Sequence, residues 1–323
     1  GRCFFETSRI MKVLFDTDPG VDDAMALYYA LAHPNLDVMG ITTTFGNVTV
    51  EQATENALYL CAMAGFNTPV ASGASQPIDK PAEAPPVHIH GQDGLGNLLG
   101  RSPHHRCAVS QNAAEFLVET VRAHPHEITV VAVGPLTNIA AALALDKDWA
   151  SQVKRLVIMG GAVHVPGNVT AFAEANIWND PHAAAAVFAA DWQVDVVSLD
   201  VTHQVIIPAK LIESLATHHT HPAMDALNQA VRFYANFYSH RHPDTVGQIG
   251  GCFGHDVLAF MALTNPEYFQ TEAASLTVVI DGDEAGRTVF QASDGGPHVT
   301  YRRVDAPACL AAFDRTLRGQ WLR

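Results

Sequence analysis

Short apolar runs rich in β-branched residues alternate with alanine-rich stretches along most of the chain. The runs are expected to be strands, and the stretches between them have the spacing of helices. The runs are apolar throughout, as in strands that are covered on both faces. This alternation predicts an α/β fold with an open, mainly parallel sheet and helices on both faces. The expected strands are Val13–Phe15, Val38–Thr43, Ile128–Val133, Leu156–Met159 and Val194–Leu199, and the expected helices span about 22–32, 50–64, 111–123, 136–145 and 181–190.

Past about residue 205 the pattern becomes more helical. No break in composition marks a linker, and no internal repeat is visible. We therefore predict a single domain over residues 12–323, preceded over residues 1–11 by an extension or a remnant of cloning. The expected elements of the second part are helices near 208–217 and 223–240, a helix from about Asp256, a terminal hairpin of Leu276–Ile280 with Val299–Val304, and a closing helix over Pro307–Leu317.

The charge of the chain restricts its partners. A net charge of −14, from 19 basic and 33 acidic residues, repels phosphate backbones and anionic lipid. We therefore expect no nucleic acid and no membrane as a partner, whereas a small neutral or cationic substrate carries no such penalty. No segment reaches the roughly 18 continuous apolar residues of a membrane span, and the first residues make a poor secretory signal. The five scattered cysteines form no CxxC pair, which favours a reducing, cytoplasmic location.

An acidic segment follows the first expected strand. Asp16–Asp23 places four carboxylates within eight positions, where Pro19-Gly20 turns the chain and Asp22 is expected to cap the next helix. In open parallel sheets, ligands bind beyond the carboxyl ends of the strands. Carboxylates this close raise one another's pKa values, and a hard cation such as calcium, with about six to eight oxygen ligands, would remove the repulsion. Because thiolates and paired histidines are missing here, calcium or magnesium is favoured over zinc.

Three other interpretations of this segment are possible. A capped helix with solvated aspartates explains one carboxylate but not four. An EF-hand fails because its twelfth loop position, counted from Asp16, would be Leu27 rather than Glu. A phosphatase of the haloacid dehalogenase type has a similar DxD after its first strand, but that family has Thr or Val where this chain has Gly20.

The string DTDPGVDDAMAL resembles the amino-terminal signature of the inosine–uridine-preferring nucleoside hydrolases. The blocks TTTFGNV, HGQDGLG, VGPLTNIA, VIMGGAV, GNVTAFAEANIWNDPHAA, LDVT and GHDVLA follow in the family's order, so that the resemblance spans roughly residues 12 to 320. It implies an open α/β fold and calcium-dependent hydrolysis of the N-glycosidic bond of ribonucleosides to free base and ribose. Members of this family are dimers or tetramers, which predicts a homodimer or homotetramer.

The resemblance also implies roles for individual residues. Asp18 would act as general base and accept a proton from the water that attacks C1′. Asp16 would orient one of the metal ligands or cap the loop. Carried over by position, the metal ligands are Asp18, Asp23, Asp256 and the backbone carbonyl of Val133, the substrate-binding residues are Asp22, Asn47, Asn168, Glu174 and Asn176, and the catalytic residues are Asp18, His90 and His255.

Glu174 and Asn176 lie in the apolar stretch AFAEANIW. Polar side chains there would be costly to bury without partners, so we expect a polar ligand or solvent to satisfy them. The following Asp180 and Pro181 are typical of a helix start, with Asp180 as its cap. We therefore treat Asp180 as structural.

The chain departs from the family pattern at the base end of the site. The family's HGE reads His90-Gly91-Gln92 here, so any role of the glutamate is lost or passes to Asp93. Tyr234, Tyr238 and Gln248 are candidates to contact the base, and Trp178 has no clear place. A histidine opposite the base favours pyrimidine or mixed inosine and uridine preference. The alternative to an enzyme is a nucleoside- or ribose-binding protein that holds its ligand without turnover.

Overall fold

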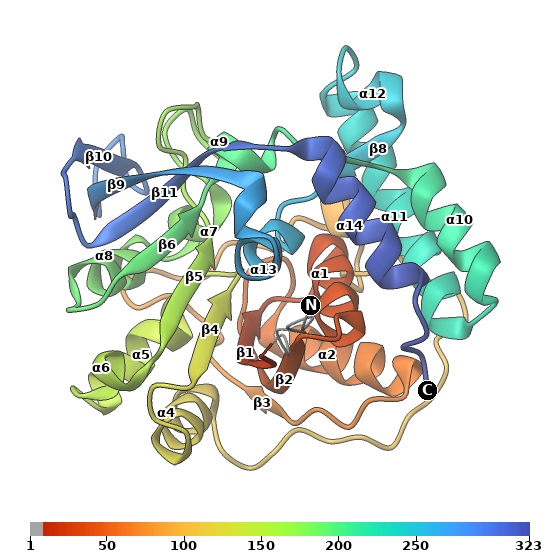
Figure 1. Ribbon diagram of the computed structural model, residues 1–323, viewed down its shortest axis with the longest axis horizontal. Helices are drawn as coiled ribbons and strands as arrows, with labels where there is room; N and C mark the ends of the chain where they lie inside the picture. The colour runs from red at the N-terminus through yellow and green to blue at the C-terminus, as the bar shows by residue number, and fades with distance from the viewer. Residues whose placement is uncertain (1–8) are drawn as a thin grey trace, which may run out of the picture.

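A nine-stranded sheet forms the centre of the protein, which we describe from a computed structural model over residues 9–323 (Figure 1). Its strands are β1 (Met11–Thr17), β2 (Leu36–Thr43), β3 (Val70–Ser72), β4 (Ile128–Ala132), β5 (Arg155–Met159), β6 (Val194–Val197), β9 (Phe269–Val278), β10 (Thr288–Ala292) and β11 (His298–Val304). They are ordered β10-β9-β11-β6-β5-β4-β1-β2-β3. All neighbours from β11 to β3 are parallel, and only β9 runs antiparallel to β10 and β11. The predicted mainly parallel α/β sheet is confirmed.

Helices cover both faces of the sheet. They are α1 (Val21–Ala32), α2 (Val50–Ala64), α3 (Val87–His90), α4 (Ala113–Ala123), α5 (Thr137–Leu145), α6 (Trp149–Gln152), α7 (Ala175–Asn179), α8 (Pro181–Ala189), α9 (Leu199–Thr202), α10 (Ala209–His219), α11 (Pro222–Arg241), α12 (Val246–Ile249), α13 (Val257–Thr264), the 3-10 helix η1 (Pro266–Tyr268) and α14 (Ala306–Arg318). Successive side chains of a strand point to opposite faces. Val13 and Phe15 of β1 therefore pack into the core formed with α1, α2, α13 and α14, whereas Leu14 packs with α4, α5 and α8. Between residues 9 and 323, no helix combines the length and apolarity needed to span a membrane.

The helix-rich part of the chain lies beside the amino-terminal half of the sheet, at the upper right in Figure 1. Its helices α10 and α11 pack together, and α11 also contacts α1, α2 and α3. A small sheet of β7 (Ile206–Pro208) and β8 (Gly251–Phe253) joins the two ends of this region. The expected helices near 208–217 and 223–240 are thus present as α10 and α11, and this packing carries α11 close to α3.

Three details of the expected elements are wrong. The terminal hairpin is a three-stranded antiparallel unit, because β10 lies between the two expected strands in sequence and β9 begins at Phe269. Much of β9 and β10 is exposed and polar, so neither shows a continuous apolar run. The strand expected to reach Leu199 ends at Val197, and Leu199 begins α9. The first strand starts at Met11, inside the proposed extension, whose residues 1–8 lie outside the described range.

Candidate functional site

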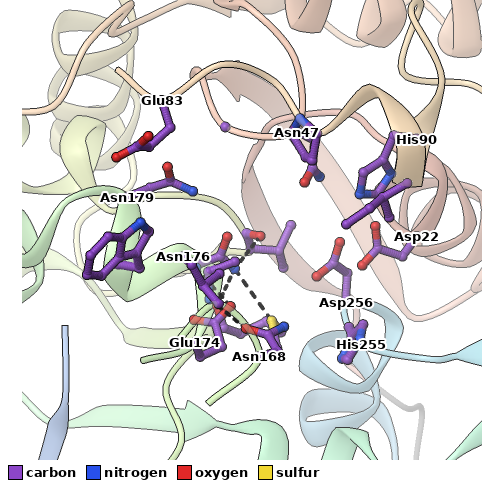
Figure 2. A pocket seen from close by; sticks show the side chains of 18 of the residues that line it. Asp22, Asn47, Glu83, His90, Asn168, Glu174, Asn176, Asn179, His255 and Asp256 are labelled. Atoms are coloured by element: carbon purple, nitrogen blue, oxygen red, sulfur yellow. Dashed lines mark hydrogen bonds between the residues drawn. The ribbon is translucent and has the colours of Figure 1, made fainter. Parts of the chain in front are cut away.

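A cavity of about 460 Å³ opens at the carboxyl ends of the parallel strands (Figure 2). Asp22, Asn47 and Val133 reach it from the segments that follow β1, β2 and β4. Of the predicted site residues, those that line it are Asp22, Asn47, His90, Val133, Asn168, Glu174, Asn176, His255 and Asp256. The remaining two, Asp18 and Asp23, are 1% exposed, and both accept hydrogen bonds from the lining residue Asn47. The fold therefore brings together residues from the first and the last third of the chain.

Four buried aspartates form one end of the cavity. Asp22, Asp23 and Asp256 each place a carboxylate oxygen within 4.8 Å of the other two. The Asp18 carboxylate lies beside them, packed so closely against Gly46 that a Cβ atom there would collide with it. Gly46 has a φ of +148°, so both its backbone and the lack of a side chain are required. The compact group differs from the ligand set carried over by resemblance, since it contains Asp22 and not Asp18.

The hydrogen bonds of these carboxylates are unequally distributed. The Asp23 carboxylate accepts them from the Thr17 hydroxyl (2.6 Å), the Gly20 N–H (3.2 Å) and Asn47 Nδ2 (2.9 Å). The Asn47 N–H donates to Asp18 Oδ2 at 2.8 Å. By contrast, Asp18 Oδ1 and Asp22 Oδ1 are buried and have no hydrogen-bond partner among residues 9–323. A buried polar atom without a partner is costly, and these two oxygens are free to contact a ligand.

Asp22 does not cap the helix as expected. Gly20 occupies the N-cap position of α1, and Asp22 lies in its first turn. Asp23 instead accepts the Gly20 N–H, and this capping bond leaves the Asp22 carboxylate directed at the cavity.

The burial of the aspartates opposes their ionisation. It raises the pKa of Asp16 and of Asp22 to about 7, and the charge of Asp23 adds to the effect at Asp22. Burial, followed by the charges of neighbouring aspartates, also raises the pKa of Asp18 and Asp256 well above the usual range. A bound cation would remove this repulsion, and the donors are all oxygens. The residues therefore fit a hard divalent cation such as calcium or magnesium.

Glu174 and Asn176 are buried, and backbone groups bind the Glu174 carboxylate and the amide nitrogen of Asn176. The Glu174 carboxylate caps α7 and accepts the N–H groups of Gly161 (2.9 Å), Asn176 (2.8 Å) and Ile177 (3.2 Å). Asn176 Nδ2 donates to the carbonyls of Val133 and Met159, both at 2.9 Å. The expectation that a ligand or solvent satisfies Glu174 is wrong, because backbone N–H groups do so. For Asn176, backbone carbonyls account for Nδ2 only, and the side chain lines the cavity. Burial still raises the pKa of Glu174 to about 7.

Aromatic and histidine rings line the cavity beside the aspartates, with His90 next to Asp22 and His255 next to Asp256 (Figure 2). The rings of His90 and Tyr234 stack with centroids 5.1 Å apart, and Tyr238 packs edge-on against Tyr234 at 4.9 Å. His255 Nδ1 lies 2.8 Å from the Thr202 hydroxyl, and its Nε2 lies 3.3 Å from the Tyr238 hydroxyl. Burial lowers the pKa of both histidines, so both rings are neutral at neutral pH. This wall suits a flat heterocycle.

Of the candidates proposed for base contact, Tyr234 and Tyr238 line the cavity, whereas Gln248 does not. Trp178, which the sequence left unplaced, lines it from the end of α7, together with Glu83. Lys80 Nζ donates to the Trp178 carbonyl at 2.8 Å and lies 4.5 Å from the centre of its ring. The sequence gives no signal for these residues, because Glu83 reaches the site through the path of a proline-rich loop and Trp178 through the orientation of α7.

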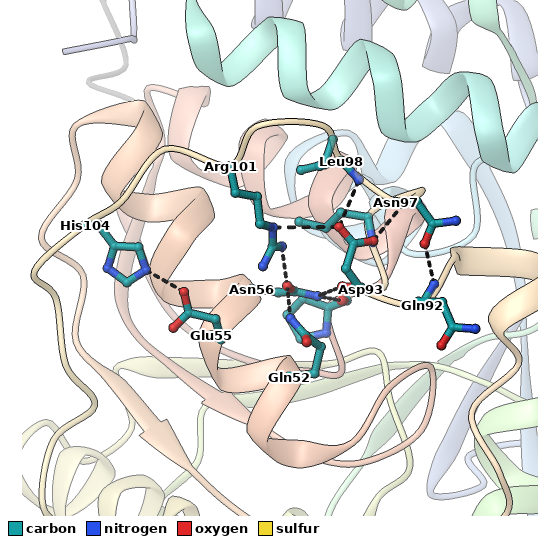
Figure 3. A network of polar contacts seen from close by, with 11 residues as sticks. Gln52, Glu55, Asn56, Gln92, Asp93, Asn97, Leu98, Arg101 and His104 are labelled. Atoms are coloured by element: carbon teal, nitrogen blue, oxygen red, sulfur yellow. Dashed lines mark hydrogen bonds and ion pairs between the residues drawn. The ribbon is translucent and has the colours of Figure 1, made fainter.

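The departure at Gln92 and Asp93 lies outside the cavity (Figure 3). The Asp93 carboxylate accepts the N–H groups of Leu95 (2.9 Å), Asn97 (2.8 Å) and Leu98 (3.0 Å). The exposed Gln92 donates its N–H to Asn97 Oδ1 at 2.7 Å. Asp93 thus holds the shape of the loop that carries His90.

Asp180 acts as the predicted helix cap. Its carboxylate accepts the Ala183 N–H at 3.0 Å and begins α8, with Pro181 in the first turn. It also accepts the Thr137 hydroxyl and the Ile78 N–H, and none of these contacts reaches the cavity.

Comparisons with known proteins relate this chain to nucleoside hydrolases and nucleosidases. The sequence profile described as inosine-uridine preferring nucleoside hydrolase matches residues 13–311. Probable uridine nucleosidase 1 of Oryza sativa subsp. japonica is 40% identical over 281 residues, which cover 86% of this chain and 84% of the relative. A plant nucleoside hydrolase, PpNRh1, has a similar structure with a TM-score of 0.89 and 35% identity, covering 96% of this chain and 99% of its own. The purine-preferring ribonucleoside hydrolase of Gardnerella vaginalis also gives a TM-score of 0.89, at 33% identity over 95% and 98% of the two chains.

Proposed function

The chain belongs to the inosine-uridine preferring nucleoside hydrolase family, and we propose that it releases the base from uridine and related ribonucleosides with calcium held by its buried aspartates. It is an N-glycosyl hydrolase, and a ribonucleoside is its substrate. The observation that carries the proposal is the pair of buried oxygens on Asp18 and Asp22, which have no hydrogen-bond partner among the described residues and lie beside aromatic rings of the same cavity.

Of the hard divalent cations that these residues fit, we propose calcium. Asp18, Asp23, Asp256 and the Val133 carbonyl would hold it, and Asp22 would hold a ribose hydroxyl beside it. When bound, calcium supplies positive charge that orients the ribose hydroxyls and makes a water more acidic. Because this arrangement uses the 2′-hydroxyl, deoxynucleosides are expected to be poor substrates.

Asp18 is the general base of the proposed reaction. The Asn47 N–H holds its Oδ2, which leaves Oδ1 to accept the proton of the water that attacks C1′. The bond to the base breaks as the sugar develops positive charge, and nearby carboxylates stabilise that charge. Asn168, Glu174 and Asn176 shape the sugar pocket at the lower side of Figure 2.

His90 and His255 act at the leaving base. His90 Nδ1 accepts the Val21 N–H at 3.1 Å, so the neutral ring carries its proton on Nε2. It can therefore donate a hydrogen bond to the base. His255 is connected to the Tyr238 hydroxyl through Nε2, and we assign it to protonation of the departing base. Because its ring is neutral at neutral pH, it first takes up a proton from solvent and then gives that proton to the base as the glycosidic bond breaks.

Two alternatives have less support. A phosphatase would need Asp16 as nucleophile, but Asp16 is fully buried, and its Oδ1 accepts hydrogen bonds from Thr42 (2.6 Å) and Asn138 (2.8 Å). Among the described residues that line the cavity, none is Lys or Arg, which a phosphate would need. A binding protein without turnover would not need a general base, whereas Asp18 Oδ1 is available to accept a proton.

The base preference, assembly and location of this enzyme belong to the proposal as well. The name of the rice relative favours uridine, and we propose a pyrimidine or mixed inosine and uridine preference. We propose a homodimer or homotetramer, which light scattering in solution would test. Within residues 9–323 the cysteines are free of disulfides, which supports a cytoplasmic location.

The decisive experiment is a chromatographic assay for free base and ribose. Uridine, cytidine, inosine and adenosine would each be tested with calcium and after exhaustive chelation. We expect metal-dependent release, fastest from uridine or inosine. Release that persists after full chelation would contradict the calcium site, and no release by folded, calcium-loaded protein would contradict turnover.

A further inference from the structure

Two loops of the site touch each other. One follows β1 and carries the aspartates, and the other follows α3 and carries His90. A Cβ atom on Gly20 would collide with the His90 ring, and one on Gly94 would lie 3.1 Å from the Pro19 carbonyl oxygen. The Val21 N–H also donates to His90 Nδ1 at 3.1 Å. The place of the His90 ring in the cavity is therefore set by how these loops meet.

Asn56 of α2 bonds to both loops. Its side chain is fully buried and does not line the cavity. Its Nδ2 donates to the carbonyl of Pro19 in the aspartate loop and to the carbonyl of Asp93 in the His90 loop, both at 2.8 Å (Figure 3). A single amide group outside the cavity thus links the aspartate loop to the His90 loop.

The amide of Asn56 has no free hydrogen-bonding position. Its Oδ1 accepts from Gln52 Nε2 at 2.9 Å and from Arg101 Nη2 at 2.5 Å. A primary amide offers two donors and two acceptor positions, and all four are used. Because Arg101 can only donate, it fixes the amide with its oxygen outward and its nitrogen toward the two carbonyls. Arg101 is itself held over the Tyr59 ring, 4.7 Å from its centre, and lies 3.7 Å from the Asp93 carboxylate.

We propose that Asn56 is a positioning residue, which fixes His90 relative to the catalytic aspartates, with Arg101 orienting its amide. The His90 loop is internally held by Asp93, so it moves as a unit when its attachment is lost. A shift of about 1 Å in a catalytic group can cost roughly 100-fold in rate. This inference rests on the proposed role of His90 at the leaving base.

A double-mutant cycle tests it. Asn56→Ala leaves both carbonyls without their donor, and we expect kcat for uridine to fall by roughly 30-fold because His90 is misplaced. In a His90→Ala background the same change is expected to lower kcat less than about threefold, because effects that pass through one residue are not additive. Calorimetric titration with calcium alone is expected to give a Kd within about threefold of the unmodified enzyme, since the aspartates keep their own hydrogen bonds.

Control variants separate positioning from stability. Val187→Ala shortens a fully buried side chain in the opposite core, and at matched loss of thermal stability it is expected to leave kcat unchanged. If Asn56→Ala does not fold, Arg101→Leu replaces it, with an expected loss of roughly tenfold and the same lack of additivity. Arg101→Lys should recover part of the loss, since it restores one donor.

The outcomes of the cycle distinguish the two levels of the argument. Equal losses from Asn56→Ala with and without His90 would overturn the positioning role, as would wild-type activity of Asn56→Ala beside an impaired His90→Ala. Full activity of His90→Ala by itself would instead remove His90 from the proposed mechanism, and the inference with it.

Discussion

Two adjoining parts of the cavity, a carboxylate end and a base end, are built on different principles. At the carboxylate end, Asp18, Asp22, Asp23 and Asp256 present buried oxygens, two of which have no hydrogen-bond partner among residues 9–323. At the base end, rings from α3 and α11 pack against one another, as His90 does with Tyr234 at 5.1 Å. The first end depends on the exact charge and position of a few atoms. The second depends on shape and stacking, which several combinations of rings can provide.

Because of this difference, we expect one set of residues to determine the reaction and another set to determine which base is preferred. Three of the four aspartates come from one eight-residue segment, so a short sequence motif is enough to predict the carboxylate site. The ring wall is assembled from α3, α11 and the segment before α13, which are far apart in sequence. Similar structures include one with purine preference, whereas a close relative in sequence is called a probable uridine nucleosidase. Substitutions at the two ends should therefore have different consequences.

The largest effect is expected at the carboxylate end. Asp18→Asn removes the general base, and kcat is expected to fall by roughly 10³- to 10⁴-fold, near the upper range for such catalysis. Thermal unfolding should change little or shift upward, since a buried charge with a raised pKa is lost. Steady-state kinetics with uridine and a melting curve would check both. Near-normal turnover would mean that another group is the base.

Removal of calcium is expected to have the next largest effect. Chelation should lower kcat by roughly 100-fold or more, because a bound cation contributes several kcal/mol to catalysis. The stabilisation by calcium should also depend on pH. Since the folded pKa values of Asp16 and Asp22 are raised to about 7, the metal-free fold loses stability as pH rises from about 4 to 7. The increase in melting temperature on adding calcium should thus be larger at pH 8 than at pH 5.5. An equal increase at both would contradict a carboxylate site.

At the base end, His255→Ala is expected to lower kcat for uridine by roughly 100-fold, the lower range for a general acid. With p-nitrophenyl riboside, whose leaving group needs no proton, the loss should be much smaller. Parallel assays with the two substrates measure this contrast. Equal losses would argue against a role of His255 in the departure of the base.

Tyr238→Phe is expected to have a moderate effect. It removes the hydroxyl that lies 3.3 Å from His255 Nε2 and keeps the ring that packs against Tyr234. The loss of one hydrogen bond corresponds to about fivefold in kcat for uridine. The ranking of the four nucleosides should stay the same, because the stacking surface is retained. A changed ranking would show that the hydroxyl itself reads the base.

The smallest effect is expected at Gln92→Glu, which restores the family's HGE. Gln92 is exposed and outside the cavity, so kcat and KM should stay within about twofold, as for most surface substitutions. Steady-state kinetics with uridine and inosine would measure this. A large gain in kcat would show that the side chain at position 92 moves into the cavity during the reaction.

The parts of the molecule that sequence reasoning predicted are those with local causes. The function of the segment Asp16–Asp23 could be predicted because few structures explain four carboxylates within eight positions. The parallel sheet could be predicted because apolar runs alternate with helical stretches. The exposed strands β9 and β10 lack that pattern, so a hairpin was expected in place of three strands. The burial of Glu174 suggested a ligand because its partners, the N–H groups of Gly161 and Ile177, are invisible until the chain is folded.

Tyr234 and Tyr238 lie four residues apart on α11, and therefore on the same face of one helix. Each residue turns a helix by about 100°, so a single insertion or deletion before Tyr234 would rotate both rings away from the cavity together. Point substitutions, in contrast, exchange one ring at a time. On the proposed role of these rings at the base, substitution along α11 would adjust the base preference gradually, while changes in the length of this helix are expected to be selected against.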